Sequence, residues 1–147
     1  MFRTIIAGTD GSDTAQEAVR QAVGLARLTA AHLHVITAYG ATTAVAALAG
    51  ASGYATEALS LPQQRAGAEG LLDRSLSGVD TDGVAVTAHA RQGDAADALI
   101  DLASELSADL IVVGSRGMTG ARRFFLGSVP NRVAHHADCA VHIVHTC

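Results

Sequence analysis

A glycine-rich stretch in the C-terminal third of the chain carries the residue types best suited to chemistry. Gly114 and Gly117 are followed, after nine further residues, by Gly127 and Ser128. Glycines let backbone N–H groups approach a ligand closely, and the N-terminus of a helix attracts anions. We therefore predict a phosphate-binding loop with Ser128 as the N-cap of the next helix. We expect Gly127 to adopt an unusual backbone angle that a branched side chain would restrict.

Arginine is the only strong cation available to such a loop. All ten residues counted as Lys or Arg are arginine, so the chain contains no lysine. A P-loop of the type G-x-x-x-x-G-K-[ST] is therefore excluded. Arg116, Arg122 and Arg123 lie in the loop, and each is either a phosphate ligand or an ordinary solvated charge. Backbone amides would supply most of the donors in both cases.

An acidic residue follows the first apolar segment. Thr4 to Thr9 has the pattern of a strand, Gly11 supplies a turn, and Ser12 or Asp13 can cap a helix. Asp10 lies between the strand and the turn. A carboxylate beside phosphates needs a hydroxyl, an amine or Mg²⁺ to offset repulsion, so we favour a nucleoside or metal contact for Asp10 over a purely capping role.

The remaining reactive residues form no catalytic or metal-binding set. G-x-S-x-G, H-E-x-x-H and C-x-x-C motifs do not occur. His135 and His136 are adjacent, while His32 and His34 share a strand face without a third ligand. We therefore predict histidines at the surface or at a helix end, and no metal site. Cys139 is expected to be a buried apolar residue rather than a nucleophile.

The residues described above must be positioned by the secondary-structure elements of the chain, whose apolar residues recur with two different spacings. Strand-like segments alternate with segments of helical spacing, which requires a mostly parallel sheet covered on both faces. We predict an α/β fold: one doubly wound domain over residues 1–147, with a five-stranded parallel sheet and helices on both faces. Tyr39 to Leu61 has weak periodicity and is interpreted as a mobile or partly helical insertion. The expected strands are Thr4–Thr9, Leu33–Ala38, Val84–Ala90, Leu110–Val113 and Ala140–His145.

The loop and the strand-one acid together resemble the universal stress protein family. The spacing G-x-x-G-x9-G-[ST] follows the fourth strand, and similarity extends over nearly the whole chain, from Thr4–Ser12 through Asp109–Gly114 to Val141–Val144. The resemblance implies an adenine nucleotide alpha hydrolase-like sheet with strand order 3-2-1-4-5. The chain departs from the family at Pro130, where a polar residue is more usual, and in the Tyr39 to Leu61 insertion.

The resemblance also implies a nucleotide site. In the nucleotide-binding branch, the loop matching Gly114 to Val129 holds the ribose and phosphates of ATP, and the acid matching Asp10 helps to hold the nucleoside. The end of strand two, near Ala38, lines the adenine. This chain keeps every glycine of the motif, which places it in that branch. The candidate binding residues are Gly8, Thr9, Asp10, Ala38, Val113, Gly114, Ser115, Arg116, Gly117, Gly127, Ser128 and Val129.

These features predict an adenine-nucleotide-binding regulatory protein of the stress response, with ATP as ligand, with or without Mg²⁺. One alternative is a slow ATP hydrolase or phosphotransferase at the same loop, although no base beyond Asp10 is evident for phosphoryl transfer. Another is a sensor of AMP or cyclic AMP. A flavin carrier is disfavoured because aromatic residues make up only 3% of the chain.

Composition limits the partners. The 147 residues carry a net charge of −4, without a basic stripe for nucleic acid or an apolar run for a membrane. We expect a cytoplasmic protein, since no leader-like segment precedes the first strand. As the last strand of the sheet, Ala140 to His145 should be an apolar edge, so we predict a homodimer joined through it.

Overall fold

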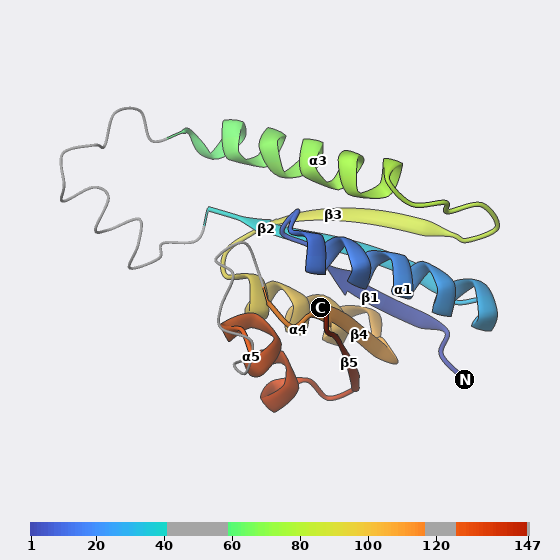
Figure 1. Cartoon of the computed structure of the whole chain (residues 1–147). Coiled ribbons are helices and arrows are strands. Elements are labelled where there is room, and N and C mark those ends of the chain that lie inside the picture. The colour runs from blue at the N-terminus through green and yellow to red at the C-terminus, as the bar shows by residue number, and fades with distance from the viewer. Residues whose placement is uncertain (41–58, 117–125, 147) are drawn as a thin grey trace.

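The computed structural model describes residues 1–40, 59–116 and 126–146. Strands and helices alternate over these ranges, as the sequence periodicity predicts. Each strand except the last is followed by a helix (Figure 1). The elements are β1 (Thr4–Gly8), α1 (Asp13–Thr29), β2 (His32–Tyr39), α3 (Leu61–Ser77), β3 (Val86–Gln92), α4 (Ala95–Leu106), β4 (Leu110–Gly114), α5 (Ser128–His136) and β5 (Ala140–Val144).

The strands form one parallel sheet of five strands in the order β3-β2-β1-β4-β5. The predicted fold class and strand order are therefore confirmed. Ile6 in the central strand pairs with His34 of β2 on one side and with Ile111 of β4 on the other. The chain winds outward from β1 to β3 and then returns to place β4 on the other side of β1.

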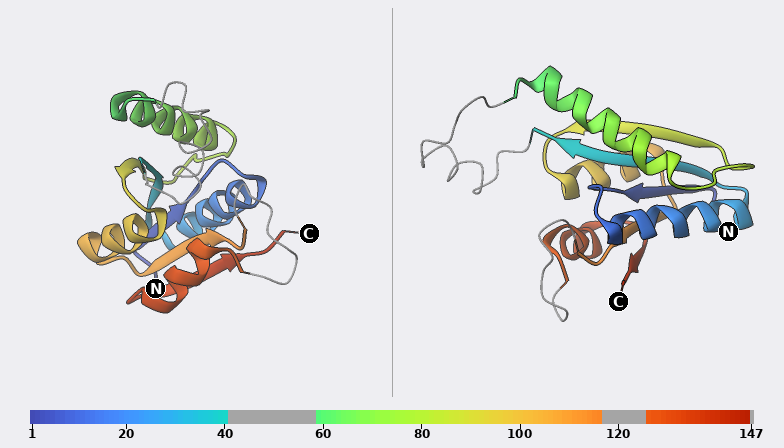
Figure 2. Two further views of the ribbon diagram at one scale, coloured as in Figure 1. Left: turned by 90° about the vertical axis from the view of Figure 1, so that its left-hand side faces the viewer. Right: turned by 45° about the horizontal axis from the view of Figure 1, so that its top comes forward.

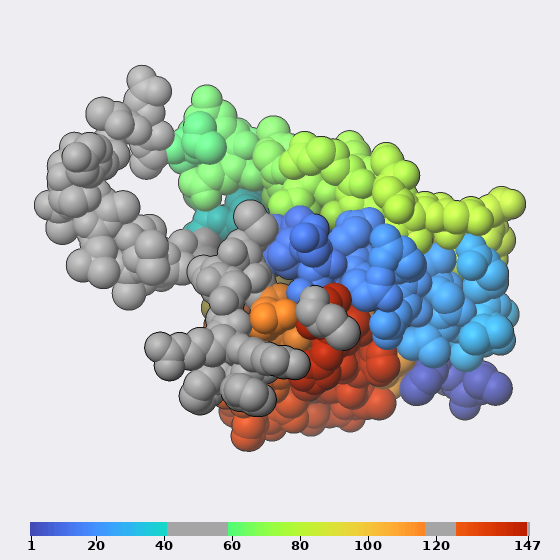
Figure 3. Space-filling view, in the orientation of Figure 1, coloured from blue at the N-terminus to red at the C-terminus, as the bar shows by residue number. Residues whose placement is uncertain are grey.

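Helices cover both faces of the sheet. α1 and α3 pack on one face and α4 and α5 on the other, as the end-on view in Figure 2 shows. Successive side chains of β1 point to opposite faces of the sheet, so the core has two halves. Ile5 and Ala7 face α1, whereas Ile6 faces α4. α1 buries a stripe of alanines, which lets it lie close to the sheet. In the space-filling view α1 lies between α3 and the C-terminal elements (Figure 3).

Side-chain caps define three of the helix starts. Ser12 caps α1 by accepting a hydrogen bond from the Ala15 N–H at 3.2 Å, which decides between the two residues proposed for that cap. Asp94 caps α4 as predicted, accepting from the Asp97 N–H at 3.0 Å. α3 begins with a capping box at Ser60 and a proline in its first turn.

The other strands match their expected bounds to within one residue, but two ranges differ by more. The predicted insertion lies mostly outside the described residues, although its first residue, Tyr39, ends β2 and its last, Leu61, begins α3. β3 begins at Val86 rather than at Val84. Among the described residues, none of the helices has both the length and the apolar character needed to cross a membrane.

Three histidines gather on the α4 side of β2 and β3. His34 Nδ1 lies 2.9 Å from His89 Nε2, and the His32 ring stacks on His34 with centroids 4.2 Å apart. The prediction of surface histidines is wrong for His34, which is only 8% exposed. The pairing of β2 with β3 brings in His89, a residue 55 positions away. Burial, reinforced by His32 and His89, lowers the pKa of His34 to about 4.

This cluster predicts that the protein loses stability on acidification. Because His34 takes up a proton near pH 6.5 when unfolded but only near pH 4 when folded, the unfolded state binds more protons between these values. We expect the free energy of unfolding to fall by roughly 1 to 2 kcal/mol from pH 7 to pH 4. This is less than the full pKa difference would give, because water screens the partly exposed His32 and His89 rings.

Urea unfolding at several pH values measures this effect. The variant His34→Gln should lose less stability on acidification than the parent protein, and His136→Gln, at an exposed position of α5, should behave like the parent. Equal pH dependence in all three proteins would contradict the assignment.

Candidate functional site

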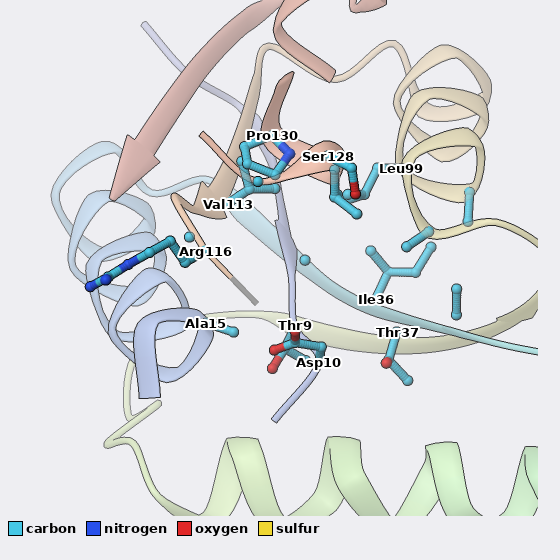
Figure 4. Close-up of a pocket in the computed structure, with 17 residues that line it drawn as sticks. Thr9, Asp10, Ala15, Ile36, Thr37, Leu99, Val113, Arg116, Ser128 and Pro130 are labelled. Carbon is cyan, nitrogen blue, oxygen red and sulfur yellow. The ribbon is translucent and has the colours of Figure 1, made fainter. Parts of the chain in front are cut away.

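A pocket with a volume of about 300 Å³ opens at the carboxyl ends of β1, β2 and β4 (Figure 4). The winding of the chain reverses between β1 and β4, because β1 leads into α1 on one face of the sheet and β4 leads toward α5 on the other. A crevice at such a point is where open α/β sheets bind ligands. The lining residues are Gly8, Thr9, Asp10, Ala15, Ile36, Thr37, Ala38, Ala95, Ala98, Leu99, Val113, Gly114, Arg116, Gly127, Ser128, Val129 and Pro130.

The N-terminus of α5 forms one end of the pocket. Ser128 is the first residue of α5 and Gly127 is its N-cap, so the prediction of Ser128 as N-cap is wrong. The Gly127 N–H donates to Ser115 O at 2.8 Å and the Gly127 carbonyl accepts from Asn131 N at 3.1 Å, which sets the helix start one residue earlier. Gly127 also has an ordinary extended conformation, with φ −62° and ψ 164°, rather than the unusual angle expected.

The absence of a side-chain cap on α5 matters for ligand binding. α1, α3 and α4 each have a side-chain acceptor on the first turn, whereas α5 has none among the described residues. Pro130, in the first turn, has no N–H to satisfy. Within the described ranges the N–H groups of Ser128 and Val129 meet no side-chain acceptor, and an anion in the pocket would meet them together with the positive end of the helix dipole.

Much of the remaining pocket lining is apolar. Ile36 and Ala38 of β2, Leu99 of α4 and Val113 of β4 supply hydrocarbon surface. Gly8 allows Leu99 to pack directly against the end of β1, because a Cβ at this position would lie 3.1 Å from Leu99 Cδ1. A flat heteroaromatic ring fits such a lining through apolar contact.

Asp10 and Arg116 are the charged residues among those that line the pocket. Asp10 Oδ1 accepts a hydrogen bond from Ser12 N at 2.9 Å, so the carboxylate shapes the turn before α1. Arg116 Nη2 donates to the Thr146 carbonyl at 3.1 Å, and Thr146 in turn bonds to Thr14 of α1. Figure 4 shows the Arg116 side chain extending toward α1. In this structure the guanidinium therefore binds the C-terminal tail.

The structure brings most of the predicted site residues together. Ser115 does not line the pocket: it is 4% exposed, and its N–H donates to the Val144 carbonyl. Gly117, Arg122 and Arg123 lie outside the described residues. The predicted residues that line the pocket are Gly8, Thr9, Asp10, Ala38, Val113, Gly114, Arg116, Gly127, Ser128 and Val129.

Sequence reasoning missed the wall formed by α4. Ala95, Ala98 and Leu99 follow the apolar i, i+3, i+4 spacing that was interpreted only as a core-facing stripe. The cap at Asp94 was the available signal, since a helix that begins directly after a parallel strand has its first turn at the carboxyl edge of the sheet. The other missed residues are Ala15, Ile36, Thr37 and Pro130.

Metal and thiol chemistry gain no support from the described ranges. Within them, no group of three or more His, Cys, Asp or Glu side chains is placed to hold a metal ion. Cys139 is half-buried and packs against the α4 and α5 side of the core. Burial raises the pKa of its thiol, which disfavours the nucleophilic thiolate.

Known proteins resemble this chain over its whole length. The sequence model of the universal stress protein family matches residues 1–145. Universal stress protein MJ0531 of Methanocaldococcus jannaschii is 31% identical over 144 residues, covering 98% of this chain and 82% of that protein. A universal stress protein solved in complex with cAMP is 31% identical, with a TM-score of 0.66 and coverage of 99% and 98% of the two chains. Hypothetical protein MJ0577 shares the fold, with a TM-score of 0.79 at 19% identity and coverage of 100% and 98%.

Close packing beside the pocket predicts opposite effects for two glycine substitutions. In Gly114→Ala the new Cβ would lie 2.7 Å from Thr14 Cγ2 and 3.1 Å from the Thr14 backbone, so we expect a loss of about 1 to 3 kcal/mol in the free energy of unfolding. Gly24→Ala, with open space around it in α1, should gain about 0.5 to 1 kcal/mol. Urea unfolding of both variants is the measurement, and a Gly114→Ala protein as stable as the parent would contradict the packing.

Proposed function

Because this chain belongs to the universal stress protein family, we propose that it binds an adenine nucleotide in the pocket at the carboxyl ends of β1, β2 and β4. The relatives compared above are named as stress proteins and not for a reaction. The observation that carries the proposal is the α5 N-terminus, which has no side-chain cap within the described ranges and lines the same pocket as an apolar surface. A nucleotide offers both matching parts, an anionic tail and a flat apolar base.

Two kinds of lining in the pocket orient the ligand. The base lies in the slot of Ile36, Ala38 and Leu99, where burial of ring surface is favourable. The phosphates lie against the N–H groups of Ser128 and Val129, where the helix dipole favours negative charge. This orientation places the sugar near the turn that contains Asp10, so that its carboxylate meets a hydroxyl rather than a phosphate.

The proposed contacts are the predicted residues that line the pocket, together with the α4 residues that the sequence did not indicate. Ser115 then acts through its backbone, by holding Gly127 in place. A role for Gly117 stays a prediction, as do a single domain over residues 1–147 and a cytoplasmic location.

ATP is the ligand we propose, with or without Mg²⁺. Cyclic AMP is the second candidate, because a relative 31% identical to this chain was solved in complex with cAMP. The two ligands make different demands on the loop. A triphosphate extends along several donors, whereas a cyclic phosphate needs few, so competition between ATP, AMP and cyclic AMP for the pocket measures the preference.

We also propose a homodimer joined through β5. This strand is at the edge of the sheet and pairs only with β4 among the described strands. Val141 and Ile143 are half-buried, which leaves apolar surface beside unpaired backbone groups. A second copy of the same strand would pair with these groups across a two-fold axis.

The first prediction from this proposal is that Gly127→Val abolishes nucleotide binding in a folded protein. A Cβ at Gly127 would lie 3.3 Å from Ser115 O and 3.6 Å from Arg116 Cα, so a branched side chain would press on that backbone and displace the α5 amides that we propose to hold phosphate. Calorimetry with ATP measures the affinity. Gly67→Val, at an open position of α3, is the matched control and should bind like the parent. Unchanged affinity in Gly127→Val would show that this loop is not part of the binding site.

The second prediction is that bound ATP is hydrolysed far below the usual enzyme range of about 1 to 1,000 per second. Amides that hold the ground state and the transition state equally well accelerate nothing. Phosphate release with Mg²⁺ should be followed in the parent, Asp10→Asn and the exposed control Asp73→Asn. Turnover above about one per second that is lost only in Asp10→Asn would establish a hydrolase instead.

The third prediction concerns assembly. Light scattering at tens of micromolar protein should give the mass of a dimer, and the double variant Val141→Asp/Ile143→Asp should be a monomer because charge opposes edge pairing. Ala88→Asp, at an exposed position of the opposite edge strand β3, should remain a dimer. A monomeric parent protein, or a dimer that survives the double substitution, would show that this interface is wrong.

A further inference from the structure

One arginine joins two neighbouring helices that both line the pocket. α4 lines the pocket from Ala95 onward, and α5 lines it from its N-cap Gly127 onward. Arg132, in the second turn of α5, donates from Nη1 to Asp94 Oδ2 and from Nη2 to Asp97 Oδ1, each at 2.6 Å. Both carboxylates lie at the start of α4, and the arginine therefore connects the second turn of α5 to the start of α4.

We propose that Arg132 is a positioning residue: it holds the phosphate-binding end of α5 in a fixed place relative to the nucleoside-binding wall of α4. The inference rests on the proposed function and adds a residue that does not itself line the pocket. A nucleotide bridges the two walls, so its full affinity requires that base and phosphates find their partners at the same time. Precise support of binding groups by residues behind them is a general requirement of such sites.

Apolar packing holds both helices against each other and reaches their first turns. Val133 and Leu99 share one buried cluster with Ala96, and Val129 packs against it. Such packing is not directional, whereas hydrogen bonds to a guanidinium are. Asp94 Oδ2 accepts both the Asp97 N–H that caps α4 and the guanidinium of Arg132. The planar guanidinium contacts two carboxylates at once, and this double contact favours one mutual orientation of the two helices.

The ion pairs are too exposed to contribute much to stability. The side chains of Arg132, Asp94 and Asp97 are 44%, 46% and 59% exposed, and ion pairs of this kind stabilise folded proteins little. Loss of the arginine should therefore change ligand affinity without a matching change in unfolding temperature. This separates positioning from a general structural role.

A charge effect must also be separated from positioning. Arg132 offsets two carboxylates beside a pocket that we propose to hold an anion, so its removal would repel phosphate even if nothing moved. The variant Asp97→Asn distinguishes the two effects, because it weakens one half of the connection to a neutral hydrogen bond while removing a negative charge. Positioning predicts weaker ATP binding in this variant, whereas charge alone predicts tighter binding.

Calorimetry with ATP and with adenosine on the full chain tests the proposal, using the parent, Arg132→Met and Asp97→Asn. Arg20→Met is the matched control, because it removes an exposed arginine whose ion pair with Glu17 lies within α1. We expect Arg132→Met to bind ATP about tenfold more weakly and Asp97→Asn a few-fold more weakly, with adenosine affinity unchanged in both. The control should match the parent with both ligands, and thermal unfolding should give all four proteins similar midpoints.

Four results would overturn the proposal. They are unchanged ATP affinity in Arg132→Met, equal losses for ATP and adenosine, tighter ATP binding in Asp97→Asn, and an unfolding midpoint of Arg132→Met far below that of the control. Failure of the proposed function itself has a different signature, since the parent protein would then bind neither ligand. That result would show that the positioning role is wrong as well.

Discussion

The reversal of chain winding between β1 and β4 is the constraint on which the rest of this structure depends. Right-handed crossovers place α1 and α3 on one face of the sheet while the chain moves outward from β1 to β3. The next crossover must return past β2 and β1, so α4 and α5 occupy the other face. The connections after β1 and β4 then diverge, which leaves a crevice between neighbouring strands with the first turns of α4 and α5 beside it.

Two glycines determine how closely other elements pack beside this crevice. Gly8 and Gly114 stand at the ends of the two diverging strands, where a Cβ would meet Leu99 in one case and Thr14 in the other at 3.2 Å or less. The helices can therefore approach the strand ends closely. The cost of this arrangement is an α5 N-terminus whose amides have no side-chain acceptor among the described residues. A bound anion would remove that cost, so that packing and the proposed ligand binding would depend on the same few residues.

The sequence predicts the secondary-structure elements and fold of this molecule better than its tertiary contacts. Periodicity identified the strands, and the loop motif located the part of the pocket formed by α5, because both signals are local. The N-cap of α5 was assigned one residue too late, since the hydrogen bond from Gly127 to Ser115 that decides it closes a loop. The partnership of His34 with His89, and the wall from Ala95 to Leu99, depend on strand register and on where a helix lies over the sheet. No local pattern contains that information.

The central claim is that backbone amides at the start of α5 hold the phosphates of a nucleotide whose base lies against β2 and α4. Titration of isotopically labelled protein with ATP, followed through backbone amide resonances, tests this claim residue by residue without any substitution. The account predicts saturable shifts that are largest at Ser128 and Val129 and extend to Ala38 and Ala95, with adenosine moving only the latter pair. Shifts centred on the histidine cluster of β2 and β3, or no saturable shifts at millimolar ATP, would contradict it.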